Sequence, residues 1–259
     1  MKFKLGDVVT RVSHNHDIVF KVVKIDGDLV FLKGVDLRLY ADSHISDLTI
    51  AKYSYNDSDR DIIAANILNV KLDRSQFFYL PGRILHIDGD SEYLERCMSF
   101  YNSMNLKANG IVIPESEIFE HIGSLLNRYR PDIVVITGHD AYYSKNKDSK
   151  NNIYQNTNNF IEAVKVARKY ERSQDKLIII AGACQSNYEE LIKAGANFAS
   201  SPKRINIHAL DPAIVASSLA LSDKNKSIDV ISLIEKTKYG SDGMGGIITN
   251  GTMYVGYPR

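Results

Sequence analysis

The chain has 259 residues, a formal net charge of +1, 44% hydrophobic residues and 24% charged residues. This composition is typical of a soluble globular protein, and the near-neutral charge argues against a nucleic acid or an anionic membrane as a partner. The two cysteines, Cys97 and Cys184, form no Cys-x-x-Cys pair, which argues against a disulfide scaffold or a zinc–cysteine site. No apolar leader or membrane-spanning run is evident, so we expect a cytoplasmic protein.

Residues 1–50 are predicted to form a small SH3-like β-barrel. Short apolar runs separated by turn residues are typical of such barrels, and the Asp-Gly-Asp sequence at residues 26–28 predicts a tight turn. The expected strands lie at residues 7–12, 18–25, 29–32 and 36–40. Residues 51–80 are more polar and are interpreted as a linker with a short helix at residues 62–72.

Residues 81–259 alternate between strand and helix patterns. Successive strand–helix units predict an α/β domain whose sheet is mostly parallel and carries helices on both faces. Near the end of the chain, Asn250-Gly251 at the centre of residues 246–255 predicts a β-hairpin. The expected strands lie at residues 83–87, 110–113, 133–137, 177–180 and 197–200, and the expected helices at 91–104, 115–129, 158–170, 188–194, 212–221 and 228–237.

One strand of this domain leads to a candidate nucleophile. The apolar run at residues 177–180 continues through three small residues to Cys184, and a helix is expected to begin with Ser186 or Asn187 as its N-cap. A thiol between a strand end and a helix N-terminus lies in the positive field of the first helical turn, which favours the thiolate. A buried structural cysteine is the alternative.

A second strand, at residues 133–137, is followed by Gly138-His139-Asp140. Catalytic groups in open α/β sheets gather beyond the carboxyl ends of the strands. The two strand ends would therefore bring an imidazole and a thiol to one rim of the sheet, which is the minimum set for a cysteine nucleophile with its base. A polar or capping role is the alternative for His139 considered alone.

Hydrolysis of an amide needs a thiolate, an imidazole that protonates the leaving amine, and hydrogen-bond donors for the oxyanion. Cys184 and His139 would supply the first two groups. The backbone N–H of Cys184 is an expected oxyanion donor, and a second donor is expected near Gly138. Asp140 is a candidate for orienting the imidazole, with a capping role as its alternative.

Several strings of this sequence closely resemble the YabG sporulation peptidases of endospore-forming bacteria. These strings are HIDGD at residues 86–90, RPDIVVITGHDAY at 130–142, AGACQSNYEELIKAGANFASSP at 181–202 and INIHALDP at 205–212, with further matches at 6–11 and 39–48. The resemblance covers nearly the whole chain. It implies a peptidase that cleaves spore coat and cortex-associated proteins after Arg during sporulation.

The His-bearing strand followed by an Ala-Cys strand is also similar to the caspase-like cysteine peptidases, which include clostripain, gingipain and separase. This similarity implies a caspase-like fold for residues 81–259 and a dyad of His139 and Cys184 without an obligatory third member. Those enzymes usually carry His-Gly, whereas this chain has Gly138 before His139, which leaves the second oxyanion donor open. Some of these relatives use calcium, but no calcium-binding loop is recognisable here.

Recognition of a substrate arginine needs a carboxylate that can pair with both edges of the guanidinium group. Asp88 and Asp90 follow the strand at residues 83–87, on the same rim as the proposed dyad, and Asp211 is a third candidate. Each of these acids has a loop or helix-capping role as its alternative.

The same specificity leads to the hypothesis of self-cleavage in the linker, because Arg60 and Arg74 lie there. Two rival functions stay open. Asp88-Gly89-Asp90 resembles the Asp-x-Asp of haloacid-dehalogenase-type phosphatases, in which the first Asp is nucleophile and Mg²⁺ ligand, although the later motifs of that class are not evident. The other rival is a non-catalytic adaptor for spore assembly. For the peptidase, neither a metal nor another cofactor is expected.

Overall fold

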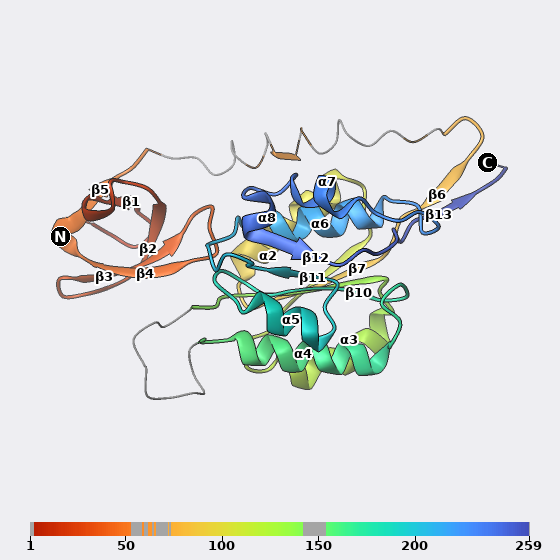
Figure 1. Ribbon diagram of the computed structural model, residues 1–259. Coiled ribbons are helices and arrows are strands. Elements are labelled where there is room, and N and C mark those ends of the chain that lie inside the picture. Colours follow the sequence, from red (N-terminus) through yellow and green to blue (C-terminus); the bar gives the residue numbers. More distant parts are fainter. Residues whose placement is uncertain are drawn as a thin grey trace.

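The computed structural model describes residues 3–52, 59, 62, 63, 65, 72, 74–141 and 154–258. Within this part of the chain, an N-terminal antiparallel sheet lies beside a larger layered α/β unit (Figure 1). Most of the helix expected at residues 62–72 falls outside the described residues, as does Arg60. None of the helices in the described ranges is long and apolar enough to cross a membrane.

The N-terminal sheet has five strands in the order β4-β3-β2-β1-β5. Its core forms because alternate residues of the strands point inward, among them Val9, Phe20 and Leu32, which are almost fully buried. The strands are β1 (Val8–Arg11), β2 (Val19–Asp26), β3 (Leu29–Gly34), β4 (Tyr40–His44) and β5 (Leu48–Ile50), with short 3₁₀ turns at Val12–His14 and Ile45–Asp47.

The prediction of a strand at residues 36–40 is wrong. Strand β4 begins only at Tyr40, and residues 35–39 form an irregular connection from β3 to β4. Leu37 instead makes an isolated antiparallel bridge with His208 of the α/β unit. The apolar residues that suggested a strand therefore serve a contact between the two units.

The α/β unit is built on a six-stranded sheet in the order β12-β11-β10-β9-β7-β8. The pairs from β8 to β11 are parallel, and β12 is antiparallel at the edge. This confirms the predicted mostly parallel sheet. The strands are β7 (Ile84–Asp88), β8 (Ala108–Val112), β9 (Ile133–Thr137), β10 (Ile178–Ala181), β11 (Phe198–Ser200) and β12 (Met244–Gly246), and a separate two-stranded ribbon joins β6 (Phe78–Leu80) to β13 (Tyr254–Gly256).

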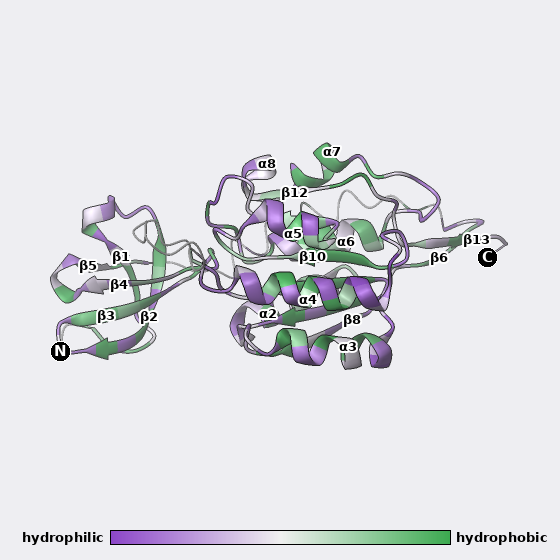
Figure 2. Cartoon of the chain, turned by 60° about the horizontal axis from the view of Figure 1, so that its bottom comes forward, coloured by the Kyte–Doolittle hydropathy of each residue, from purple (hydrophilic) through white to green (hydrophobic). Residues whose placement is uncertain are grey.

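Helices cover both faces of this sheet (Figure 1). Helices α3, α4 and α5 lie on one face, and α2 and α6 lie on the other. In Figure 2 hydrophilic and hydrophobic residues alternate along α3 and α4, as expected for helices with one buried side. The helices are α2 (Ser91–Ser103), α3 (Ile118–Tyr129), α4 (Thr157–Tyr170), α5 (Tyr188–Ala194), α6 (Asp211–Ala220), α7 (Val230–Ile234) and α8 (Gly240–Gly243).

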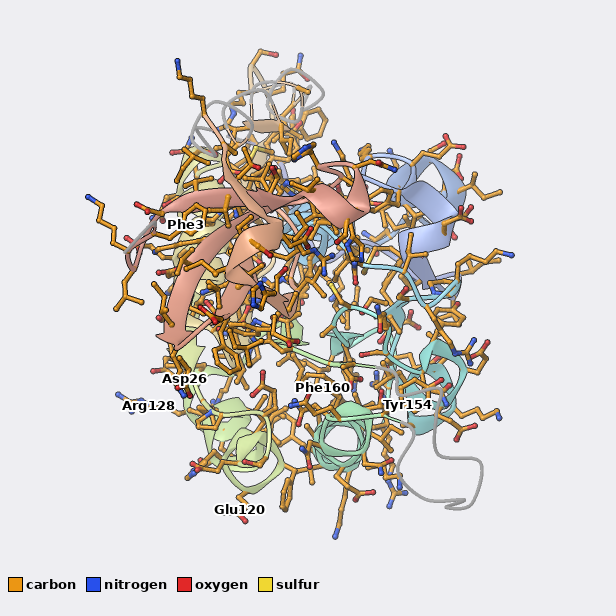
Figure 3. All side chains as sticks on the ribbon, turned by 90° about the vertical axis from the view of Figure 1, so that its left-hand side faces the viewer. Phe3, Asp26, Glu120, Arg128, Tyr154 and Phe160 are labelled. Atoms are coloured by element: carbon orange, nitrogen blue, oxygen red, sulfur yellow. The ribbon has the colours of Figure 1, made fainter. Side chains whose placement is uncertain are left out.

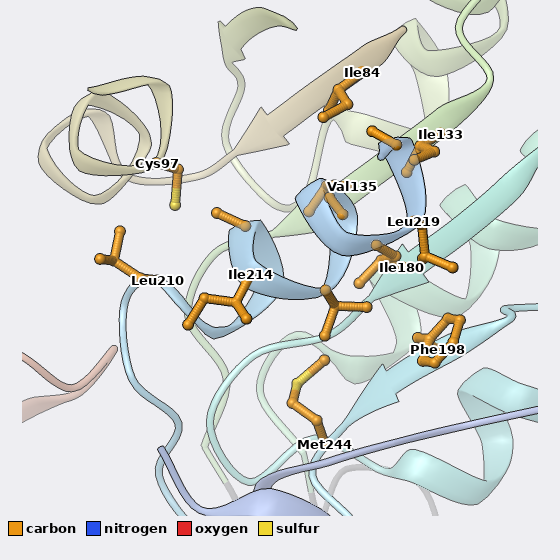
Figure 4. Close-up of a cluster of buried hydrophobic side chains, with 14 of the residues drawn as sticks. Ile84, Cys97, Ile133, Val135, Ile180, Phe198, Leu210, Ile214, Leu219 and Met244 are labelled. Carbon is orange, nitrogen blue, oxygen red and sulfur yellow. The ribbon is translucent and has the colours of Figure 1, made fainter. Parts of the chain in front are cut away.

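Each face of the sheet has its own hydrophobic core. On the α3–α4 side, Phe160 of α4 is fully buried, whereas Glu120 of α3 lies on the outer side (Figure 3). On the other side, Ile214 and Leu219 of α6 pack against the sheet near Val135 (Figure 4). The continuous apolar strands suit a sheet that is buried on both faces.

The prediction of a β-hairpin around Asn250-Gly251 is also wrong. Strand β12 pairs with β11, and β13 pairs with β6, so the two ends of this segment do not pair with each other. Residues 250–253 instead run along the end of α6, where the Thr252 amide donates to the Leu219 carbonyl at 3.0 Å. A Cβ atom on Gly251 would collide with the backbone carbonyl of Ser222. Glycine is needed there for a close backbone approach rather than for a two-residue turn.

We predict that Gly251→Ala lowers the free energy of unfolding by about 1–3 kcal/mol, because the added methyl group overpacks against backbone that cannot move aside. Gly123→Ala is the matched control. Gly123 lies within α3 with only Val166 Cγ1 nearby at 3.7 Å, so alanine there should raise stability by roughly 0.5–1 kcal/mol. Urea denaturation of both variants measures the difference, and equal stabilities would contradict this packing.

Candidate active site

The candidate site lies at the carboxyl ends of three adjacent parallel strands, β7, β9 and β10. Asp88 is the last residue of β7, and His139 and Cys184 follow β9 and β10 by a few residues. The sheet register pairs Ala181 with Ile136. Because 184 − 139 equals 181 − 136, Cys184 and His139 each lie three residues beyond two paired positions of neighbouring strands.

Both side chains belong to the same face of the sheet. Cys184 is part of the buried cluster that contains residues of α2 and α6. The ring of His139 lies against Tyr93 of α2, with the two ring centroids 5.7 Å apart. No hydrogen bond joins Cys184 Sγ to the His139 ring in the described part of the chain.

The Cys184 thiol is buried in this structure. It is 1% exposed, and its Sγ accepts a hydrogen bond from the Ile207 amide at 3.2 Å. Burial raises the pKa of Cys184 to about 12, although the Ile207 amide and the Arg38 charge act in the opposite direction. The expected N-cap Asn187 is confirmed, and Cys184 lies three residues before it, so burial has the larger effect on the pKa of Cys184 in this structure.

Glycine at position 182 allows the chain to turn away from the sheet before Cys184. Gly182 has a φ of +106°, and a Cβ atom there would come within 2.7 Å of Ser200 Oγ and 2.8 Å of Leu191 Cδ1. Only glycine combines this backbone conformation with such close neighbours. Gly182 thus directs the chain toward the position of Cys184, whose side chain is buried rather than surrounded by open space.

His139 is held by Glu115, which the sequence analysis did not single out. One carboxylate oxygen of Glu115 accepts the backbone N–H of His139 at 2.7 Å and lies 3.3 Å from its Nδ1. Burial raises the pKa of Glu115, but its bonds with His139 outweigh this effect, so the pKa lies below its usual value. The available signal was a pair of glycines: a Cβ atom on Gly89 or on Gly138 would collide with the Glu115 side chain.

Asp140 points away from the imidazole. Its carboxylate accepts hydrogen bonds from Ser186 Oγ at 2.8 Å and from the Asn156 amide at 2.8 Å, and it also bonds with the hydroxyl of Thr157. These contacts join the start of α4 to the connection between β10 and α5. In this structure Glu115, not Asp140, provides the carboxylate beside the His139 Nδ1 atom.

Asp88 forms a fully buried ion pair with Arg38 from the N-terminal sheet. Arg38 Nη1 donates to Asp88 Oδ2 at 2.6 Å, and both side chains are 0% exposed. The carboxylate also accepts from Thr137 Oγ1 at 2.8 Å and from the Asp90 amide at 2.9 Å. Burial opposes ionisation of Asp88, but the Arg38 charge outweighs it and keeps the pKa of Asp88 well below its usual value.

The other two candidate acids have different partners. Asp90 is the N-cap of α2, and its Oδ2 lies 2.6 Å from Nζ of Lys33 on β3. Asp211 accepts the backbone amides of His208 and Lys238 at 2.8 and 2.9 Å, while burial raises its pKa to about 6. Of the three candidate acids, only Asp88 makes a direct ion pair with a guanidinium group.

The phosphatase alternative needs the carboxylates of Asp88 and Asp90 to share one Mg²⁺ ion. In this structure these carboxylates pair separately with the cationic side chains of Arg38 and Lys33. Among the described residues, no group of three or more His, Cys, Asp or Glu side chains is arranged to hold a metal ion. These separate pairings do not match the shared ligation of one Mg²⁺ ion that the phosphatase alternative requires.

Two comparisons with known proteins identify the family of this chain. The family model described as YabG peptidase U57 matches residues 4–258. The "Sporulation-specific protease YabG" of Bacillus subtilis (strain 168) is 38% identical over 287 aligned positions, which cover 100% of this chain and 99% of that protein. No solved structure matches the chain. The chain belongs to the YabG peptidase family.

Proposed function

We propose that this peptidase is a cysteine endopeptidase, with Cys184 as nucleophile and His139 as general acid and base. The observation that most supports the proposal is the sheet register, because both residues follow paired positions of neighbouring strands by three residues. A thiol and an imidazole so arranged are the minimum set for nucleophilic attack on an amide. Glu115, 3.3 Å from His139 Nδ1, would orient the imidazole and stabilise its charged form.

In the proposed reaction His139 takes the Cys184 proton, and the sulfur forms a bond to the carbonyl carbon of the substrate. The imidazolium then gives its proton to the leaving amine as the C–N bond breaks, which leaves a thioester. Water, deprotonated by His139, attacks the thioester and releases the carboxylate and the thiol. The backbone N–H of Cys184 is the proposed oxyanion donor, with a second near Gly138.

We propose Asp88 as the residue that selects arginine before the cleaved bond. A buried carboxylate that already binds a guanidinium group has the charge and the geometry needed for a substrate arginine. Asp90 and Asp211, the other candidates, have other partners in this structure. Asp88 and the proposed dyad occupy one rim of the sheet, so an arginine bound there would lie next to the nucleophile.

The relative in Bacillus subtilis is named for sporulation, and we propose a role in sporulation for this chain too. Its proposed substrates are spore coat and cortex-associated proteins in the cytoplasm of the sporulating cell. We also propose a caspase-like fold for residues 81–259, an SH3-like barrel for residues 1–50 and a linker between them. Self-cleavage after Arg60 or Arg74 in that linker belongs to the same proposal.

We expect Cys184→Ala and His139→Ala each to lower kcat/KM for a fluorogenic arginyl peptide by about 10²–10⁴-fold, because each removes a group that acts in the transition state. His121→Ala is the matched control, because His121 is an exposed histidine on α3. Full activity in the Cys184 variant would rule out the proposed nucleophile.

The acid that selects arginine can be identified by comparing Asp88→Asn, Asp90→Asn and Asp211→Asn. Asp88→Asn should reduce the kcat/KM ratio of arginyl to citrullinyl peptides on the order of 100-fold, because loss of one partner of a buried charge pair costs several kcal/mol. The other two substitutions should leave this ratio nearly unchanged, whatever they do to stability. A larger loss of selectivity in either of them would reassign the pocket.

Glu115→Gln tests the proposed positioning role of Glu115. We expect kcat to fall on the order of 10-fold or more, with KM nearly unchanged, because the imidazolium loses a charged partner while the substrate pocket stays intact. Glu117→Gln, an exposed change at the N-terminal end of α3, is the control. A rise in KM at constant kcat would instead assign Glu115 to substrate binding.

A further inference from the structure

The connection from β3 to β4 lies across the candidate site like a bound peptide. The Arg38 amide donates to the Ile207 carbonyl at 3.2 Å, and the Ala209 amide donates to the Asp36 carbonyl at 2.7 Å. Between them, Leu37 bridges His208 in the antiparallel sense. Pairing of this kind is how an extended peptide adds to an exposed backbone edge.

The side chain of Arg38 fills the pocket that we assign to a substrate arginine. Besides the ion pair with Asp88, its Nη2 donates to the Ala209 carbonyl at 3.1 Å, and its guanidinium carbon lies 5.1 Å from the centre of the Tyr93 ring. Carboxylate, carbonyl and aromatic face together meet the needs of a guanidinium group. No part of Arg38 is exposed.

The same connection and the residue that follows it also reach the proposed dyad. Tyr40, the first residue of β4, lies against the His139 ring with 4.4 Å between ring centroids, and its hydroxyl donates to Asp90 at 3.3 Å. The Ile207 residue that accepts the Arg38 amide also donates its own amide to Cys184 Sγ at 3.2 Å. Residues 38–40 thus contact the base and the pocket, and Ile207 links them to the nucleophile.

The backbone conformation of this segment suits a bound inhibitor better than a substrate. The Leu39 amide donates back to the Leu37 carbonyl at 2.8 Å, which closes a tight three-residue turn at Arg38. The Tyr93 hydroxyl donates to the carbonyls of Gly34 and Leu37 at 2.6 and 2.8 Å. The chain therefore bends away directly after Arg38 instead of continuing across the site.

We propose that residues 36–39 are a built-in substrate mimic, which holds the peptidase latent until the N-terminal sheet releases its connection from the site. This inference rests on the proposed function. Because the mimic is part of the same chain, its effective concentration is on the order of millimolar, so an ordinary substrate competes poorly. Release would expose the Cys184 thiol and open the Asp88 pocket together.

The alternative is that Arg38 only ties the two units together. The experiment uses the full-length chain and compares wild type with Arg38→Ala, Gly34→Ala and Lys21→Ala. A Cβ atom on Gly34 would collide with the Leu37 carbonyl, so Gly34→Ala displaces the connection while Arg38 and Asp88 stay unchanged. Lys21 makes an exposed contact with Glu92 between the same two units and serves as the control.

We expect kcat/KM for a fluorogenic arginyl peptide to rise about 10-fold or more in Arg38→Ala and Gly34→Ala. In wild type the state with the connection released is populated at about 0.1–10%, and in these variants it becomes the main state. Lys21→Ala should stay close to wild type. Agmatine, a small guanidinium compound, should inhibit Arg38→Ala and raise its Tm, and should have little effect on the Tm of wild type, whose pocket is filled.

If Arg38→Ala and Gly34→Ala fold but are no more active than wild type, latency is overturned. If their cleavage of peptides still depends on Cys184, the proposed function stands. If Arg38→Ala does not fold, the activity of Gly34→Ala alone tests latency. Binding of agmatine to Arg38→Ala without cleavage of any peptide by any variant would instead contradict the proposed function. Quantitative scission of active wild type between Arg38 and Leu39 would show that the segment is a substrate, which also overturns latency.

Discussion

The buried ion pair between Arg38 and Asp88 is the interaction on which the rest of this structure depends. Removing two charges from water is costly, so the other hydrogen bonds of both side chains must be satisfied. Thr137 and the Asp90 amide donate to the Asp88 carboxylate, and Arg38 donates to the Ala209 carbonyl. Loss of one partner of such a pair costs about 3–5 kcal/mol, because the other charge stays buried alone. The pair therefore couples the position of the N-terminal sheet to the state of the carboxyl rim of the larger sheet.

The parallel sheet supplies the rigid frame for the chemistry. Strands β7, β9 and β10 are hydrogen-bonded neighbours with both faces buried, so the residues that follow their ends have little freedom to move apart. Glycines at 89, 138 and 182 provide the space that this rim needs, two for the Glu115 side chain and one for the turn before Cys184. While the connection from β3 to β4 covers the site, burial raises the pKa of the Cys184 thiol to about 12. An activated cysteine nucleophile has a lowered pKa instead.

The local sequence pattern predicted the elements of the α/β unit well, but it could not predict contacts between residues far apart in the sequence. The bounds of β9 and α5 agree with expectation because uninterrupted apolar residues in one case and a capped, acid-first helix in the other are determined locally. The strand at 36–40 and the hairpin at 246–255 were wrong because tertiary contacts, with residues 207–209 and with the end of α6, replaced local pairing. Arg38 and Glu115 could not be identified from the residues around them, since their partners lie 50 and 24 positions away, and the trace of Glu115 lay in the distant glycines 89 and 138.

We propose that Cys184 is the nucleophile beside an arginine pocket. The most direct measurement is peptide mapping after the full-length chain reacts with an arginyl acyloxymethyl ketone, in which a thiolate displaces the carboxylate and forms a stable thioether. We expect a single adduct on Cys184 Sγ, and in Arg38→Ala, whose pocket is empty, we expect agmatine to slow its formation. An adduct on Cys97 instead, or no adduct in a chain that cleaves arginyl peptides, would contradict it.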